Sequence, residues 1–352
     1  MRILVDGAIY SRTSGGGAIR YCTQLVEGLL ARGFDVNLLV QPGARLRAVQ
    51  GYPRCRIVGS VAGSRSYDVC HTPFPSRVAV VPGARSVVTV HDLIDRRLPP
   101  ALTAHACGEQ EVDEGWAFVD EVDHIVAISE TTRRDLEVVL GVAADRVTVI
   151  HHGVSPVFGP VDQVVGRESV AAELGVCAPY ILHVGARAGY KNFLALLEAF
   201  CTSRARVAAK LVVVGGEPYL SEDEREVASA HGLRASDVVL AGSVSDELLA
   251  CLYAGAAVVA MPSLYEGFGY PIIEAQACGG LVACSRMGAF LEVGGPAPLL
   301  FDPTDVADIA RTLEEALCDP HVERRTSGRD WAAGFSEDRM IAGYAELYGS
   351  LS

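Results

Sequence analysis

The sequence predicts an α/β fold in which two doubly wound domains follow one another. Three observations support this prediction. The chain has 352 residues, which is too long for one ordinary hydrophobic core. Short runs of Val, Ile and Leu alternate with helix-like segments, as in βαβ units whose parallel sheet is buried on both faces. The pattern stops near residue 150 and restarts at residue 180, beyond a stretch rich in Pro and Gly.

The strands are predicted from short apolar runs. In the first half these runs are residues 2–5, 36–40, 69–71, 86–90, 124–128 and 147–150. In the second half they are residues 180–184, 211–214, 238–240, 257–261, 281–284 and 299–300. Helices are expected at residues 19–30, 167–174 and 337–351, the last because its apolar residues recur at one-face spacing.

The domain boundary is expected within residues 152–178, which contain Gly153, Pro156, Gly159 and Pro160. We therefore predict a first domain of residues 1–163, joined by a C-terminal helix of about residues 336–352, and a second domain of residues 164–335. In such sheets, ligands bind outside the carboxyl ends of the strands. Candidate functional residues are therefore those that directly follow a strand.

The charge of the chain argues against some classes of partner. The formal net charge is -13, from 30 basic and 43 acidic side chains, and only Lys191 and Lys210 among the basic residues are lysines. No run of basic residues is longer than a doublet. Because nucleic acids and anionic membranes are bound by clustered Lys and Arg, we expect neither as a partner. An anionic ligand would have to be bound by a few local groups.

The cysteines and the apolar segments predict a cytoplasmic protein. The ten cysteines are scattered and form no C-x-x-C pair, which is typical of reduced, buried residues. The sequence starts directly with a predicted strand rather than with a leader. The longest apolar stretch, residues 250–261, is too short to cross a bilayer, so no integral membrane segment is expected.

Two segments of the first half follow predicted strands. Gly15, Gly16 and Gly17 precede the helix at residues 19–30 and could offer backbone amides to an anion, although a flexible turn explains them equally well. His91 and Asp92 follow the strand at residues 86–90. His91 could bind a ligand hydroxyl or move a proton, with Asp92 orienting it, or it could simply satisfy local backbone groups.

A glycine-rich loop opens the second half. It runs from Val184 to a predicted helix start and contains Arg187 and Lys191, which could together bind a diphosphate. Solvated surface cations are the ordinary alternative. That alternative is weaker for Lys191, because this chain uses Arg for nearly all of its positive charge.

The segment at residues 261–275 contains two glutamates of different character. Gly267 and Gly269 mark a tight loop and Pro271 fits the first turn of a helix, so Glu266 lies in the loop and Glu274 about one turn into the helix. On a continuous helix the two would lie about 80° apart, which argues against the paired carboxylates of a glycosidase. We expect separate contacts to different parts of one long ligand, although an acidic residue in a first helical turn is favoured in any case.

These residues resemble the retaining glycosyltransferases of family 4, which have the GT-B fold of two facing Rossmann-like domains with a cleft between them. The stretch SLYEGFGYPIIEAQACGG is similar to the E-x7-E signature of that family, with Glu266 and Glu274 as its glutamates. The resemblance extends nearly end to end. Its other segments are the glycines from Gly15, HDL at His91, AISETTRRDL from Ala127, VIHHGV from Val149, VGARAGYKN from Val184 and AGSVSDELLACLYAGA from Ala241.

The resemblance implies transfer of a sugar from a nucleotide-diphosphate-sugar, held mainly by the second domain, to an acceptor hydroxyl held mainly by the first, with retention at the anomeric carbon. It implies that Glu274 binds the ribose, Glu266 lies near the donor sugar, Lys191 neutralises the diphosphate and His91 faces the reacting sugar. It also implies further donor contacts by Val244, Phe268, Gly269 and Tyr270. From the residues themselves we add Arg187 as a donor contact, and Gly15, Gly16, Gly17 and Asp92 as an acceptor or phosphate side.

The sequence departs from the family pattern in the phosphate loop. Ala186 and Tyr190 stand where many members have Arg, so either Arg187 substitutes from a shifted position or stabilisation of the diphosphate rests on Lys191 and helix amides. There is no D-x-D triplet, and we predict an enzyme that needs neither a metal nor another cofactor.

Several functional alternatives stay open. The predicted acceptor is a small soluble molecule such as a specialised metabolite, because no basic amphipathic segment is present. An epimerase or hydrolase acting on a nucleotide-sugar, or a binding protein without activity, is also compatible with these motifs. His91 and Asp92 could serve as a base in an inverting route.

Overall fold

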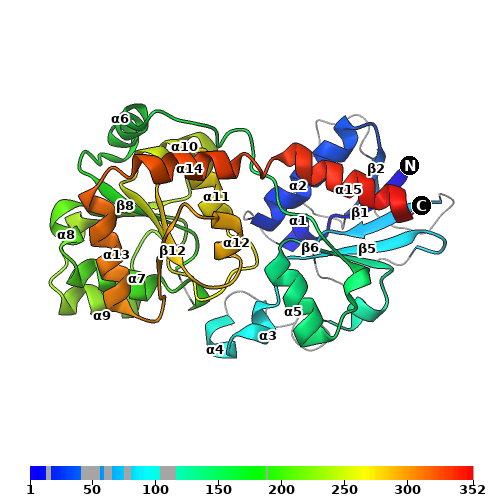
Figure 1. Cartoon of the computed structure of the whole chain (residues 1–352), viewed down its shortest axis with the longest axis horizontal. Coiled ribbons are helices and arrows are strands. Elements are labelled where there is room, and N and C mark those ends of the chain that lie inside the picture. Colours follow the sequence, from blue (N-terminus) through cyan, green and yellow to red (C-terminus); the bar gives the residue numbers. More distant parts are fainter. Residues whose placement is uncertain are drawn as a thin grey trace. The chain divides into compact units, whose positions relative to one another are not determined.

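The computed structural model describes residues 1–12, 17–40, 56–58, 66–74, 81–103, 116–187 and 189–351. The predicted α/β class is confirmed, because the chain forms two compact units that each contain a parallel sheet with helices packed against it (Figure 1). The first unit comprises residues 1–96, 109–153 and 335–352, and the second comprises residues 97–108 and 154–334.

The sheet of the first unit has seven strands within the described residues, all parallel, in the order β3-β2-β1-β4-β5-β6-β7. The central strands are buried on both faces, which is why their sequences are continuous apolar runs. The strands are β1 (Arg2–Asp6), β2 (Asp35–Leu39), β3 (Arg56–Val58), β4 (Val69–Thr72), β5 (Arg85–Val90), β6 (His124–Ala127) and β7 (Val147–Val149).

The sheet of the second unit has six parallel strands in its described part, in the order β10-β9-β8-β11-β12-β13. Counted from its first strand this is the order 3-2-1-4-5-6, and the first unit repeats the same order before β7. The strands are β8 (Tyr180–Val184), β9 (Lys210–Val214), β10 (Val238–Gly242), β11 (Val258–Met261), β12 (Val282–Ser285) and β13 (Leu299–Phe301).

This strand order places the ligand edge of each sheet. The order reverses between β1 and β4 in the first unit and between β8 and β11 in the second. Loops that leave the carboxyl ends of two such strands diverge to opposite faces and leave room for a ligand between them. The residues after β8 and β11 are therefore the first candidates for binding in the second unit.

Helices connect the strands, and their ends follow ordinary capping rules. In α5, Ser129 accepts the N–H of Thr132 at the start and Gly141 adopts a left-handed conformation at the end. The helices of the first unit are α1 (Ile9–Arg12), α2 (Gly17–Ala31), α5 (Glu130–Leu140) and α15 (Glu337–Leu351), with the short α3 (Ile94–Arg97) at its border. Those of the second unit are α4 (Pro100–Thr103), α6 (Gln163–Leu174), α7 (Phe193–Thr202), α8 (Ala205–Ala208), α9 (Glu222–Ala230), α10 (Asp246–Gly255), α11 (Tyr270–Ala277), α12 (Phe290–Gly294), α13 (Val306–Cys318) and α14 (Val322–Ala332).

Before the C-terminal helix rejoins it, the first unit extends to Gly153 and not to the expected residue 163. Residues 154–163 group with the second unit because Phe158 is buried in the core that also contains Tyr253. The short strand β3 was not predicted, since three residues give too little pattern to recognise.

The C-terminal helix α15 packs beside α2, far from it in the sequence (Figure 1). Their shared core contains a buried triangle of hydroxyl groups. Tyr21 Oη lies 2.6 Å from Tyr344 Oη and 2.8 Å from Thr89 Oγ1, and Thr89 Oγ1 lies 3.0 Å from Tyr344 Oη. His71 extends the network, with Nε2 2.9 Å from Thr89 Oγ1 and Nδ1 2.5 Å from Tyr348 Oη. The last helix is thus held by directional bonds as well as by apolar packing.

Replacement of Tyr344 by phenylalanine is expected to lower the free energy of unfolding by about 1–2 kcal/mol, because it leaves two buried hydroxyl groups with one partner fewer. The melting temperature, measured by circular dichroism, should fall by several degrees. Tyr219→Phe is the matched control, since the Tyr219 side chain is 60% exposed, and should leave it unchanged. An unchanged melting temperature for Tyr344→Phe would show that the triangle contributes little.

The cysteines agree only in part with the prediction. The eight that the structure describes are free thiols, as expected, but Cys177 and Cys318 are exposed rather than buried. Both lie near the ends of helices, where the chain meets solvent. Cys55 and Cys107 lie outside the described residues.

In the described part of the chain, the helices are all too short or too polar to cross a membrane.

Candidate functional site

Lys191 and Glu266 meet at the ligand edge of the second sheet. Lys191 lies in the loop after β8 and Glu266 in the loop after β11, the two strands between which the order reverses. Lys191 Nζ donates to Glu266 Oε1 at 2.6 Å, and Ser263 Oγ donates to the same oxygen at 2.7 Å. The Lys191 side chain is 20% exposed and that of Glu266 is 12% exposed. The ion pair is therefore largely withdrawn from water but still open to a ligand.

This environment keeps the Lys191 side chain protonated and positively charged. Burial alone would lower the pKa of its ammonium group, but the adjacent Glu266 carboxylate outweighs that effect and raises the pKa above its usual value. The ammonium also lies 4.9 Å from the centre of the Tyr190 ring, a favourable cation–π distance. Lys191 is a permanent positive charge over the whole physiological pH range.

Asn192 joins the two loops, a role that the sequence did not reveal. Its backbone is left-handed, with φ of 58°, and its Nδ2 donates to the carbonyl oxygens of Pro262 at 3.1 Å and Pro303 at 2.8 Å. The backbone N–H of Leu264 also donates to the backbone carbonyl oxygen of Tyr190 at 2.8 Å. The only sequence signal was an Asn directly before a helix, which is common at helix starts.

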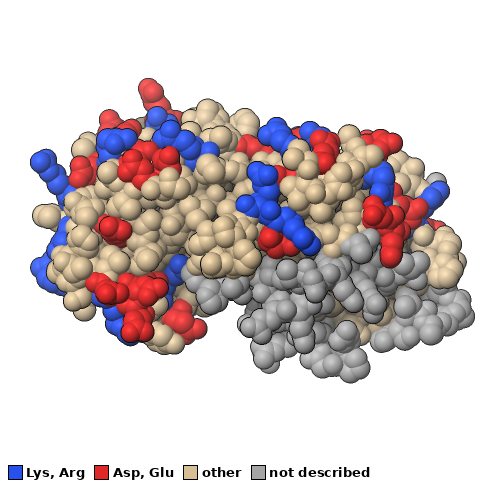
Figure 2. All heavy atoms as spheres, turned by 90° about the horizontal axis from the view of Figure 1, so that it is seen from below, with Lys and Arg blue, Asp and Glu red and all other residues tan. Residues whose placement is uncertain are grey.

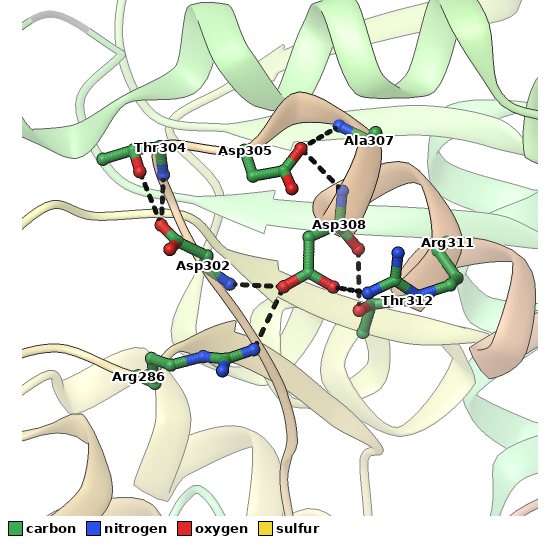
Figure 3. A network of polar contacts seen from close by, with 8 residues as sticks. All are labelled: Arg286, Asp302, Thr304, Asp305, Ala307, Asp308, Arg311 and Thr312. Atoms are coloured by element: carbon green, nitrogen blue, oxygen red, sulfur yellow. Dashed lines mark hydrogen bonds and ion pairs between the residues drawn. The ribbon is translucent and has the colours of Figure 1, made fainter.

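A polar network holds the loop after β13, which Asn192 contacts through the Pro303 carbonyl (Figure 3). Asp308 in α13 accepts the backbone N–H of Asp302 at 2.9 Å and an Arg286 N–H at 3.0 Å through Oδ2, and its other oxygen accepts from Arg311. Asp305 caps the same helix through the N–H groups of its first turn. The loop after β13 is therefore fixed at both ends, with the Pro303 carbonyl turned to Asn192.

Gly269 fixes the end of the Glu266 loop. Its φ is 98°, which favours glycine, and a Cβ at this position would lie 2.6 Å from Cε1 of Phe290. Gly288 contributes in the same way, because a Cβ there would lie 2.8 Å from the backbone oxygen of Glu266. Gly288 therefore lies tightly against the Glu266 backbone and Gly269 against the Phe290 ring, and neither position has room for a side chain.

Gly269→Ala is expected to lower the free energy of unfolding by about 1–3 kcal/mol and to reduce turnover, because the loop must shift away from Phe290. Urea unfolding and a steady-state activity assay would measure the two effects. Gly349→Ala provides the control, since a Cβ there meets nothing within 4 Å and the site lies in a helix, which favours alanine. Equal stability of the two variants would contradict this role of Gly269.

Glu274 lies in α11 and is only 2% exposed. Tyr253 in α10 donates its hydroxyl to Glu274 Oε2 at 2.9 Å. The helix begins as predicted, with Pro271 in its first turn. Of the neighbouring residues, Phe268 is buried and its ring packs edge-on against Tyr270 at 5.5 Å. The two glutamates therefore have different partners in the structure.

Arg187 is directed toward α9. Its Nε lies 3.2 Å from Glu224 Oε1 and its Nη2 donates to the Tyr219 carbonyl at 2.5 Å. The guanidinium is buried and lies 5.7 Å from the centre of the Phe193 ring. Within the described residues its Nη1 has no hydrogen-bond partner. Lys191 and Arg187 are thus committed to different carboxylates in the structure.

Val244 lies in the loop after β10 and packs, partly exposed, against the core of the second unit. This places it on the same carboxyl edge as Lys191 and Glu266, because β10, β8 and β11 belong to one parallel sheet.

In the first unit, the structure describes His91, Asp92 and Gly17, whereas Gly15 and Gly16 lie outside the described residues. Gly17 begins α2. His91 directly follows β5, and its ring bonds to the Pro73 carbonyl and to His152. Asp92 Oδ1 accepts the N–H of Ile94, the first residue of α3, at 3.1 Å.

Charged side chains of both signs lie intermixed over the described part of the face in Figure 2. Among the described residues, no group of three or more His, Cys, Asp or Glu side chains is placed to hold a metal ion.

The sequence matches two family models. Residues 15–158 match the model described as Glycosyltransferase Family 4, and residues 178–319 match the model described as Glycosyl transferases group 1. Both halves of the chain resemble glycosyltransferases. The second match contains Lys191, Glu266 and Glu274, and the first contains His91.

Curated relatives carry corresponding names. The serotype-specific mannosyltransferase WbdA of Escherichia coli is 30% identical over 243 residues, which cover 67% of this chain and 29% of the relative. A D-inositol 3-phosphate glycosyltransferase of Salinispora arenicola is 32% identical over 271 residues, covering 71% of this chain and 58% of the relative. The chain therefore spans less than two thirds of the length of these relatives.

Solved structures confirm the GT-B class with two Rossmann-like domains. Anabaena Alr3699/HepE, solved in complex with UDP-glucose, superposes with a TM-score of 0.77 at 16% identity, covering 99% of this chain and 100% of that one. Sucrose-phosphate synthase from Thermosynechococcus elongatus gives a TM-score of 0.75 at 20% identity.

Proposed function

We propose that the protein is a glycosyltransferase that moves a sugar from a nucleotide-diphosphate-sugar to an acceptor hydroxyl. The observation that carries the proposal is the ion pair of Lys191 and Glu266 at the ligand edge of the second sheet. A lysine with a secured charge beside a loop carboxylate suits a ligand that has a diphosphate next to a sugar. The matches of both halves to glycosyltransferase models support the same activity.

Each residue of the second unit then has a distinct task. When the bond from the sugar to the diphosphate breaks, negative charge develops on a phosphate oxygen, and the Lys191 ammonium stabilises it. Glu266 contacts the sugar, and Glu274 binds the ribose hydroxyls with its carboxylate, whose Oε2 accepts a hydrogen bond from Tyr253. Backbone groups of Phe268, Gly269 and Tyr270 complete the contacts with the donor.

The same assignment leads to two further proposals, on the stereochemistry of the transfer and on the need for a metal. We infer retention at the anomeric carbon, with the leaving phosphate accepting the proton of the acceptor hydroxyl, because the Glu266 to Glu274 spacing resembles the signature of retaining enzymes. Metal independence stays a prediction: Lys191 supplies positive charge where other nucleotide-sugar enzymes use a divalent ion. Arg187 has a smaller part, since Glu224 already neutralises it.

The acceptor is proposed to be a hydroxyl of a small soluble molecule, held by the first unit through His91. One relative is named as a D-inositol 3-phosphate glycosyltransferase, which favours a polyol as the acceptor class, whereas the mannosyltransferases are named for the sugar that they transfer. We further propose a cytoplasmic enzyme, as the scattered cysteines suggest.

The test is release of nucleoside diphosphate from a panel of nucleotide-sugars, with and without sugar and polyol acceptors. We expect release to depend on an acceptor and the product to keep the anomeric configuration of the donor, as determined by NMR. Turnover without any acceptor would instead support an epimerase or hydrolase. Binding without turnover under all conditions would support a protein that only binds nucleotide-sugars.

Replacement of Glu274 by glutamine is expected to raise the KM for the donor about tenfold with little change in kcat, because a ribose contact is made equally in the ground and transition states. Steady-state kinetics would measure both constants. Glu346→Gln, in the C-terminal helix, is the control. An effect confined to kcat would contradict the ribose role.

A further inference from the structure

His91 has a hydrogen-bond partner for each ring nitrogen. Its Nε2 lies 2.8 Å from the carbonyl oxygen of Pro73, and its Nδ1 lies 3.3 Å from Nε2 of His152. His91 follows β5, His152 follows β7, and Pro73 follows β4, so three segments of one sheet edge converge on this imidazole. Each of these residues belongs to the first unit.

The partners determine where the protons lie. A carbonyl oxygen can only accept, so Nε2 of His91 carries a proton. Burial lowers the pKa of His91 to about 4, and the ring is neutral near pH 7. Its Nδ1 is then an acceptor, and the donor must be Nε2 of His152. Burial likewise lowers the pKa of His152 well below its usual value, so His152 is a neutral ring protonated at Nε2.

Packing holds both rings in this arrangement. The centres of the two imidazoles are 5.2 Å apart, and the Tyr21 ring lies 5.1 Å from His91 and 4.7 Å from His152. Phe74 covers His91 from another side at 5.6 Å. His152 is 2% exposed, whereas His91 is partly exposed. The accessible ring is therefore His91, and the buried ring behind it is His152.

We infer that His152 is a positioning residue for His91: it fixes His91 as a neutral ring that donates from Nε2 to the Pro73 carbonyl and accepts at Nδ1, so that His91 does not act as a base. The N–H of His152 points at the only nitrogen of His91 that could take up a proton, and two N–H groups cannot face each other there. A base role for the pair His91 and Asp92 is thereby disfavoured. The effect on turnover rests on the function proposed above, whereas the arrangement of protons does not.

The first test determines directly which ring nitrogens carry a proton. Long-range ¹H–¹⁵N spectra of the histidine rings of the intact protein at pH 7 should show His91 and His152 both protonated at Nε2, assigned with His91→Gln and His152→Gln. In His152→Leu, the ¹⁵N signal of His91 Nδ1 should shift toward the value of an unprotonated imidazole nitrogen that accepts no hydrogen bond. His151→Leu should leave the His91 signals unchanged, because the His151 ring packs on Phe335. A wild-type His91 protonated at Nδ1, or unchanged signals in His152→Leu, would overturn the inference.

The second test separates positioning from general stability. His152→Leu is expected to lower kcat about tenfold, and His152→Gln, which keeps an N–H donor at a similar reach, should restore most of that loss. The double variant His91→Leu/His152→Leu should be no slower than His91→Leu alone, because His152 acts through His91. Additive losses would show a structural role only. If the protein turns over no nucleotide-sugar, the proposed function fails and the spectra still decide the proton positions.

Discussion

Replacement of Lys191 by alanine is expected to lower kcat about 10²–10³-fold, while the protein stays folded, because the variant lacks a preorganised charge where the leaving diphosphate becomes more negative. The environment of Lys191 is the reason for this large effect. Lys191 is mostly buried, its pKa is raised by Glu266, and it lies at the carboxyl edge between β8 and β11. Steady-state kinetics with a saturating donor would measure the change.

Two controls make this result interpretable. Lys210→Ala changes the only other lysine of the chain, which begins β9 rather than facing the carboxyl edge, and should leave kcat unchanged. Because Lys191→Ala leaves the Glu266 carboxylate without its cation, the double variant Lys191→Ala/Glu266→Gln checks whether any loss of stability comes from that buried charge. An unchanged kcat/KM in Lys191→Ala would exclude the assigned role.

Replacement of Glu266 by glutamine is expected to have two opposite effects. Turnover should fall about 10²-fold, because the carboxylate that contacts the sugar in our proposal is gone. Affinity for inorganic pyrophosphate should rise several-fold, because Lys191 no longer shares its charge with Glu266 at 2.6 Å. These opposite changes distinguish Glu266 from a residue that merely supports the fold, because loss of such a residue would weaken both turnover and pyrophosphate binding.

Calorimetric titration with pyrophosphate and a turnover assay on the same preparation would measure these two quantities. Ser263→Ala serves as the comparison, because it removes the other hydrogen bond to Oε1 of Glu266 but leaves the ion pair in place. Weaker pyrophosphate binding in Glu266→Gln would contradict the idea that the carboxylate holds Lys191 back from the phosphate.

The sequence predicted the fold class, and it singled out two loops that meet in the structure, for a physical reason. Buried parallel strands need continuous apolar runs, and ligands gather at the carboxyl ends of such strands, so Lys191 and Glu266 could each be found from local pattern. Their direct contact could not be predicted, since 75 residues separate them and strand order decides which loops meet.

The local sequence pattern did not reveal which side chains form hydrogen bonds and ion pairs with each other. Arg187 looked like a phosphate ligand beside Lys191, yet its guanidinium bonds to Glu224 and Tyr219, because the path of the chain after β9 brings α9 to it. His152 carried no sequence signal for its contact with His91, because the two residues are 61 positions apart. Asn192 was passed over because its two carbonyl partners lie 70 and 111 residues away.

The most direct test of the central claim, that Lys191 and Glu266 form the diphosphate site of a nucleotide-sugar enzyme, is a thermal unfolding comparison of the wild-type protein, Lys191→Ala and Lys210→Ala. Each is measured with a panel of nucleoside diphosphates, since a ligand of the folded state raises Tm by mass action. We predict that at least one nucleoside diphosphate raises the Tm of the wild type and of Lys210→Ala, but not that of Lys191→Ala. An equal rise in all three proteins, or no rise in the wild type, would contradict the claim.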